Sequence, residues 1–235
     1  MMRKMTHRQQ TVPRDSATIE YAGETLTLMA ARALYWLRTA TLFIADPHFG
    51  KTDAFQTAGI PVPGGATDDD LARLSKCITA TRAERLVILG DFFHTRHSQS
   101  AAVLAALDAW RNQHPSLAVT LIAGNHDRHA GPPPAELAIE TVAEPFRLRP
   151  FTCHHHPPEE PMPAAGEYIL AGHTHPVAVL RDIDGSRHRF PCFHVSDKTM
   201  VLPAFGSFTG GHTVSAKAGD HIFLICGGLV HAVNA

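Results

Sequence analysis

The feature that most constrains this chain is a repeated pairing of a short apolar run with a cluster of Asp, Asn or His residues. Five such clusters occur in order: Asp46-Pro47-His48, Gly90-Asp91-Phe92-Phe93-His94, Gly124-Asn125-His126-Asp127, Cys153-His154-His155-His156 and Gly172-His173-Thr174-His175. Each follows a run of residues that favour β-strands. Open α/β sheets bind ligands at the carboxyl ends of their strands. The pattern therefore predicts an α/β fold whose strand ends carry a ligand site.

The first half of the chain alternates between predicted strands and helices. Buried strands are predicted at 41–45, 86–89 and 118–123, and helices at 67–82 and 98–113. Thr67 and Ser98 are plausible N-caps for the two helices. The alternation indicates crossover connections and at least partly parallel strand pairing.

The second half is predicted to be rich in β-structure. Strands are predicted at 146–153, 168–171, 177–183, 188–195, 199–203 and 221–225. The expected fold class is α/β, with two mixed β-sheets packed face to face and flanked by helices. A chain of 235 residues can bury one large core, so residues 1–235 are expected to form one domain. Residues 1–20 are expected to be poorly ordered or extended.

Composition excludes several functional classes but selects none. The formal charge of −1 gives no nucleic-acid signature. The longest apolar stretch, 222–230, is too short to span a membrane, and the N-terminal residues do not form a secretory signal. The cysteines are scattered, as is typical of reduced thiols in the cytoplasm. The 17 histidines are the unusual number, because imidazole is the commonest metal-ligating side chain.

The residue types in the five clusters suit a metal site. Asp, Asn and His offer oxygen and nitrogen ligands of the kind that Mn, Fe or Zn accepts. Asp-x-His and His-x-His pairs direct two side chains to the same side of an extended backbone. A glycine before Asp91, Asn125 and His173 allows sharp turns and close approach. Any one cluster alone is more often a cap or a structural hydrogen bond, so only the whole set indicates a metal site.

The ordered set DPH, GDFFH, GNHD, a strand-end His and GHTH resembles the calcineurin-like metallophosphoesterase superfamily, whose domain is an αββα sandwich. The resemblance implies two divalent cations, most often Mn²⁺ with Zn²⁺ or Fe²⁺ as alternatives, and attack of a metal-activated hydroxide on a phosphate ester. The implied metal ligands are Asp46, His48, Asp91 and His175 for one cation, and Asp91, Asn125, His154 and His173 for the other. His154 best matches the strand-end position, with His155 and His156 as alternatives.

The same resemblance implies catalytic roles for three residues. His126 would contact the phosphate or protonate the leaving oxygen, and Asp127 would orient the imidazole ring of His126. His94 completes the GDxxH form that occurs in nucleases and related phosphodiesterases of this superfamily, and it would bind or protonate the leaving group. The alternative is that His94 only orients Asp91 or a water.

A longer similarity covers residues 24–212. The stretches ALYWLRTATLFIADPHFGKTDAFQTAGIPVPGG, LVILGDFFHTR, GNHDR, CHHHP, LAGHTHP and LPAFGSFTGG resemble the bacterial ligase-associated DNA damage response endonucleases. This branch implies a Mn-dependent DNA endonuclease that works beside a DNA ligase and a helicase. Without the capping domain of larger nucleases, cleavage of single strands or loops, without sequence specificity, is expected.

Basic side chains beside the clusters are candidates for binding flanking phosphates. Lys51, Arg96 and Arg128 follow the first three clusters, and Arg181, Arg187 and Arg189 would extend the track. The alternative for each is a solvated surface charge. Phe205 and Phe208 would either pack in the core or stack on an unpaired base.

Two other functions compete with DNA cleavage. A small-molecule nucleotide phosphodiesterase or phosphomonoesterase would use the same metals. A non-catalytic binding scaffold would have lost ligands or His126, and every position is filled here. The sequence predicts no membrane partner and leaves a homodimer open.

Overall fold

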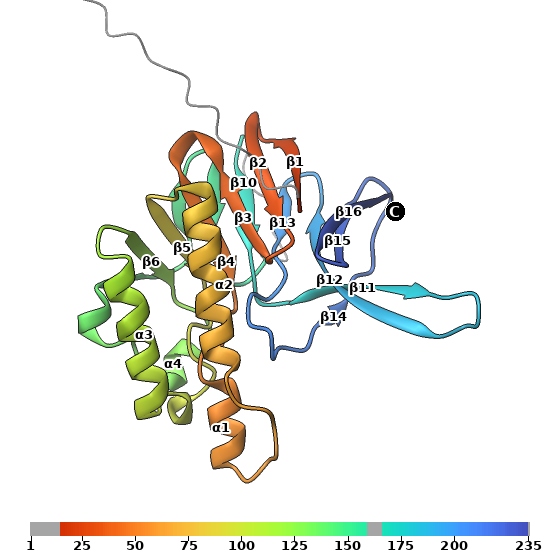
Figure 1. Ribbon diagram of the computed structural model, residues 1–235. Coiled ribbons are helices and arrows are strands. Elements are labelled where there is room, and N and C mark those ends of the chain that lie inside the picture. The colour runs from red at the N-terminus through yellow and green to blue at the C-terminus, as the bar shows by residue number, and fades with distance from the viewer. Residues whose placement is uncertain (1–14, 159–165, 235) are drawn as a thin grey trace, which may run out of the picture.

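The computed structural model describes residues 15–158 and 166–234, which form two β-sheets packed face to face (Figure 1). Residues 1–14 of the predicted N-terminal segment lie outside the described residues, whereas 16–20 belong to the first strand. The first sheet has the order β1 (Ser16–Tyr21), β2 (Glu24–Met29), β3 (Ala33–Trp36), β4 (Thr41–Ala45), β5 (Arg85–Leu89), β6 (Ala118–Ile122), β7 (Ile139–Val142). Pairing is antiparallel from β1 to β4 and parallel from β4 to β7.

The second sheet is also mixed. Its order is β14 (His212–Thr213), β11 (Pro176–Arg181), β12 (Arg187–Val195), β13 (Thr199–Val201), β10 (Tyr168–Ala171), β9 (Phe151–Cys153), β8 (Phe146–Leu148), with β15 (His221–Cys226) beside β12 and β16 (Leu229–Asn234) beside β15. β9, β10 and β13 run parallel to one another. The β11–β12 hairpin extends beyond the rest of the molecule (Figure 1).

The helices of the described residues all precede β7 in the chain. They are α1 (Lys51–Thr57), α2 (Ala66–Thr81), α3 (Ala101–Gln113) and α4 (Asp127–Ala130), with short 3₁₀ turns η1 (Leu37–Thr39), η2 (Arg96–Ser98) and η3 (Ala135–Leu137). Helices α2 and α3 cover the outer face of the first sheet, where Leu74 and Leu107 join the same buried cluster as Ile44. Ser100, rather than Ser98, caps α3 by accepting the N–H of Val103.

Strand β4 shows why its sequence is a continuous apolar run. Leu42 and Ile44 face the helices, while Phe43 and Ala45 face the second sheet, and all are fully buried. A strand covered on both faces carries apolar residues at every position. Between the sheets Phe43 packs with large rings that include Phe151, and each such ring contributes roughly 1.5–3 kcal/mol on burial.

The α/β class with two mixed sheets face to face is confirmed. One predicted strand, 146–153, is two strands, because a turn at Arg149-Pro150 separates β8 from β9. Thr67 does not cap α2. It lies inside the helix, and its hydroxyl accepts the N–H of Gly50 at 3.0 Å. Within the described residues, no helix is both long and apolar enough to cross a membrane.

Candidate metal centre

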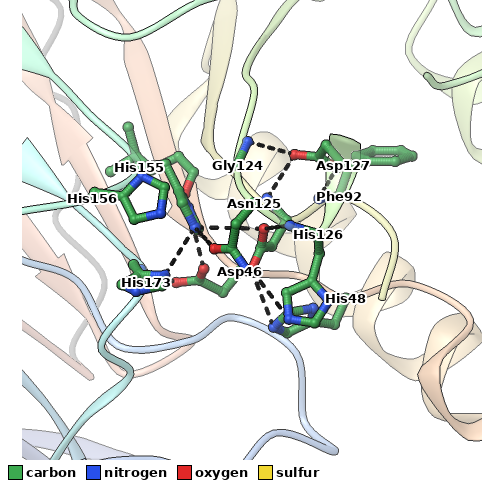
Figure 2. A network of polar contacts seen from close by, with 12 residues as sticks. Asp46, His48, Phe92, Gly124, Asn125, His126, Asp127, His155, His156 and His173 are labelled. Atoms are coloured by element: carbon green, nitrogen blue, oxygen red, sulfur yellow. Dashed lines mark hydrogen bonds and ion pairs between the residues drawn. The ribbon is translucent and has the colours of Figure 1, made fainter. Parts of the chain in front are cut away.

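Loops from both sheets bring the five polar clusters together (Figure 2). They leave the carboxyl ends of β4, β5, β6, β9 and β10. The backbone N–H of His173 donates to Asp46 Oδ2 at 2.9 Å, and that of His126 donates to Asp91 Oδ1 at 2.9 Å. Clusters far apart in sequence therefore share one network, as the parallel strand ends predict.

One half of the network contains Asp46, His48, Asp91 and His175. The ligand atoms of Asp46, His48 and His175 lie within 4.8 Å of one another. His175 Nε2 is 3.5 Å from Asp46 Oδ1, and among the described residues neither atom has a hydrogen-bond partner, although both are buried. A cation held by the carboxylate oxygen and the imidazole nitrogen would satisfy both atoms, so these side chains fit a metal ion.

The other half is built around His155, which is fully buried. Its Nδ1 lies 3.0 Å from the carbonyl oxygen of Leu89, so Nδ1 carries the proton. In the neutral ring Nε2 then presents a lone pair, and it lies 2.9 Å from Asn125 Oδ1 and 3.1 Å from His173 Nδ1. Asp91 Oδ1 is 3.5 Å away. Acceptor atoms that converge in this way fit a second cation.

Glu144 contacts the segment of three consecutive histidines, His154 to His156. Its carboxylate accepts hydrogen bonds from the backbone N–H groups of His155 and His156 at 2.9 and 3.0 Å. It also lies 2.7 Å from Nδ1 of the His156 ring. His154, the predicted ligand, lies with Nδ1 4.0 Å from Glu144. The groups of clustered ligand atoms include His155 and His156 beside His173, and none of the groups found among the described residues contains His154.

Glu144 was not predicted from the sequence, since no spacing links it to the histidines. It lies with Pro145 immediately before β8, so only the pairing of β8 with β9 brings it close. Although burial works in the opposite direction, hydrogen bonds from His156 and His155 hold the pKa of Glu144 below its ordinary value. The carboxylate fixes the segment that presents the histidines.

Left-handed backbone conformations are concentrated at the site. The non-glycine residues with positive φ include Asp46, His48, Asp91, His173 and His175, with φ between 46° and 68°. This conformation costs about 1–2 kcal/mol per residue. Strain of this kind persists only where the surrounding structure enforces it, and it is typical of functional sites.

The glycines that precede the clusters give close approach. A Cβ on Gly90 would overlap the ring of His155, and one on Gly124 would overlap the Asp91 carboxylate. A Cβ on Gly172 would lie 2.7 Å from Asp46 Oδ2. Gly90 also needs its φ of +83°. These positions let the backbone pass directly behind the side chains predicted to bind metal.

We expect Gly90→Ala to destabilise the protein by about 2–4 kcal/mol, because the left-handed backbone and the overlap with His155 both oppose the methyl group. The melting temperature should fall by roughly 10 °C. Gly185→Ala is the matched control, since Gly185 has φ +84° and nothing within 4 Å of its Cβ position. Thermal unfolding of both variants measures the difference. Equal shifts would show that backbone strain alone acts at Gly90.

The three predicted catalytic residues lie beside the predicted metal ligands. His126 Nδ1 is 2.7 Å from the carbonyl oxygen of His94, which leaves Nε2 near Asp91 Oδ2 at 4.0 Å. The rings of His94 and His126 stack at 4.8 Å. The expectation that Asp127 orients the His126 ring finds no support in its hydrogen bonds. Its carboxylate instead accepts the N–H groups of Asp91, Phe92 and Gly124 at 2.8–2.9 Å.

Burial keeps several imidazoles neutral. It is the main cause that lowers the pKa of His94 and of His173 to about 4, with further effects from Lys51 and His126 on the former and from His155 and His156 on the latter. Burial likewise lowers the pKa of His48. A neutral imidazole is the form that binds metals, so His48 and His173, two of the predicted ligands, suit metal binding at pH 7.

The predicted basic residues differ in their positions. Lys51 is half-buried, and burial lowers its pKa while Asp91 and Asp46 act in the opposite direction, which places its charge near the centre. Arg96 and Arg128 are exposed on η2 and α4. The others, Arg181, Arg187 and Arg189, are exposed on the β11–β12 hairpin, and Arg189 donates to Thr213 Oγ1 at 3.3 Å.

The chain is similar to a known protein family and to solved structures. The family described as calcineurin-like phosphoesterase matches residues 39–158. The crystal structure of Pseudomonas putida nuclease MPE is similar, with 40% sequence identity, a TM-score of 0.79, and coverage of 93% of this chain and 100% of that chain. The Escherichia coli phosphoesterase Yfce has 13% identity and a TM-score of 0.39, over 78% of this chain and 87% of its own. No curated protein matches the chain.

Proposed function

Because the chain belongs to the calcineurin-like phosphoesterase family, we propose that it is a two-metal DNA endonuclease. Family membership makes it a metal-dependent phosphoesterase. The observation that carries a nucleic-acid substrate is the 40% identity to a nuclease, over 93% of this chain, and the choice of DNA rests on the sequence resemblance described above. The resemblance of residues 24–212 to ligase-associated endonucleases adds Mn²⁺ as the metal, and a place in cytoplasmic DNA repair beside a ligase and a helicase.

We assign one cation to Asp46, His48, Asp91 and His175. The orphaned, buried atoms of Asp46 and His175 support this set. We assign the other to Asp91, Asn125, His173 and His155, in place of His154, because the Nε2 lone pair of His155 faces the Asn125 and His173 ligand atoms. Asp91 is shared, since Oδ2 lies toward His48 and Oδ1 toward His155. His156 lies close enough to His173 to support the second set.

Bound divalent cations supply Lewis acidity and an activated water for phosphodiester cleavage. The chain's own residues place the substrate and move protons. The His94 carbonyl holds His126 by Nδ1, so Nε2 is free to exchange a proton with a phosphate or leaving oxygen. Asp127 positions the loops, because its carboxylate joins the backbone after β5 to Gly124. Lys51 is the basic residue best placed to bind a phosphate near the centre.

The test is nicking of closed circular single-stranded and duplex DNA by metal-free protein reconstituted with Mn²⁺. We expect cutting that requires the metal, stops with a chelator, and falls about 100- to 10,000-fold in His126→Ala, the range for a general acid–base residue. The metal content of each protein is measured in parallel, so that loss of the proton carrier is separated from loss of the metal.

Two other outcomes would redirect the proposal. If the circles stay intact while nucleotides or aryl phosphates are hydrolysed, the metal chemistry remains and the chain is a small-molecule phosphodiesterase or phosphomonoesterase. If no ester is hydrolysed although both cations bind, the site is a binding scaffold.

A further inference from the structure

The loop 203–211 is anchored directly against the metal centre. The N–H of Phe205 donates to the Ala45 carbonyl at 2.7 Å, and that of Gly206 donates to the Asp46 carbonyl at 3.3 Å. A Cβ on Gly206 would overlap the carbonyl oxygen of Pro47. The backbone of this loop is therefore fixed against the segment that carries Asp46 and His48.

Polar side chains of α2 and of the turn between β2 and β3 also hold the loop. The Asp70 carboxylate accepts the N–H of Ser207 at 3.0 Å and the Arg73 guanidinium at 2.6 Å. Arg32 donates to the carbonyl oxygen of Gly206 at 3.2 Å. These contacts hold the position from which Phe208 leaves the loop.

The two phenylalanines of the loop have different environments. Phe205 is fully buried, and the Arg73 guanidinium lies 4.1 Å from its ring centre, so Phe205 belongs to the core. Phe208 is 37% exposed. The cavity that it borders with His48 and Lys51 has a volume of about 10 Å³, which holds at most one water. Phe208 therefore keeps part of its surface open to solvent beside His48 and Lys51.

A line of aromatic rings connects Phe208 to the proposed proton carrier. The Phe208 ring contacts Phe55 edge-to-face at 5.7 Å, and Phe55 contacts His94 edge-to-face at 5.9 Å. His94 stacks on His126. Lys51 lies four residues before Phe55 on α1, a spacing that puts both side chains on one helix face. A cation for a phosphate and a ring for a base thus lie next to each other.

We propose that Phe55 and Phe208 form a stacking subsite for one unpaired nucleobase of the strand being cut. The subsite rests on the proposed nuclease activity and gives the single-stranded or looped DNA expected from the sequence a specific contact on this chain. Every base has a π-face that an aromatic side chain can cover, so the contact needs no sequence. In a duplex the neighbouring base pairs cover those faces. The platform therefore favours a strand that is already open.

The test compares Phe208→Leu, Phe208→Trp and wild type on single-stranded circles, duplex circles and oligonucleotides with an abasic tract. We expect Phe208→Leu to lower cutting of single strands about 5- to 150-fold, the range for one stacked base, and duplex nicking less than about twofold. Phe208→Trp should keep the preference for single strands. The abasic tract should slow wild type but have no further effect on Phe208→Leu.

Ile183→Ala is the control for loss of an exposed apolar side chain, because Ile183 lies at the tip of the β11–β12 hairpin and is fully exposed. It should leave the ratio of single-strand to duplex cutting unchanged. Equal losses on both DNA forms in Phe208→Leu, or no loss on either form, would overturn the subsite while the nuclease activity stands. A wild type that cuts no DNA would overturn both proposals.

Discussion

Asp91→Asn should remove at least one bound cation and lower phosphodiester hydrolysis about a thousand-fold or more. The substitution removes one charged ligand that both cations would share. Its effect on the rate should therefore exceed the 100- to 1,000-fold loss that is typical of removing one electrostatic contact to a transition state. Asp91 is buried, and its two oxygens face opposite halves of the site. The neutral amide would leave the two cations without the charge that partly offsets their repulsion.

The substitution is chosen so that the fold survives. Asn tolerates the left-handed backbone of Asp91, whose φ is 53°. An amide oxygen can still accept the N–H of His126, as Asp91 Oδ1 does. Asp184→Asn, at the exposed hairpin tip, makes the same chemical change away from the centre. Metal content and nicking rate are measured together, and full activity with both cations bound would exclude Asp91 as the shared ligand.

The first half of the fold was predictable because local and tertiary preferences agree there. Strand β4 coincides with the predicted strand 41–45. Helix α2 (Ala66–Thr81) begins and ends one residue before the predicted helix 67–82. Parallel strands buried on both faces leave a continuous apolar run. Strands β1, β2 and β3 were not predicted, since Thr27 is buried beside Leu26 and the period of two is lost. The turn between β1 and β2 uses Ala22 at φ 57°, a conformation in which hairpin turns usually have Gly or Asn.

The site was predictable to the level of its clusters, and less so to single atoms. The order and spacing of the clusters predicted that five residues lie close together, because each follows the end of a strand. These residues are Asp46, His48, Asp91, His173 and His175. Three histidines in a row at the end of β9 carry no such signal. Which one turns inward depends on Glu144 and on the space behind Gly90, both set by tertiary contacts. The hydrogen bonds of Asp127 likewise depend on how two loops meet.

The three consecutive histidines should differ strongly in their effect on metal binding. We expect His155→Ala to lose one cation and about 100-fold or more in nicking rate, because His155 Nε2 faces Asn125 and His173. His154→Ala should retain both cations and change the rate less than about threefold. His156→Ala should fall between them, at about tenfold, the size of effect found when a residue that orients metal ligands is removed.

Metal analysis of the three purified variants, with nicking rates at saturating Mn²⁺, measures this order. Thermal unfolding in the presence of a chelator measures the destabilisation that the cavity at His155 causes, without any contribution from lost metal. If His154→Ala lost the cation and His155→Ala kept it, the ring that turns toward Asn125 would not be the ligand, and His154 would have to exchange places with it when metal binds.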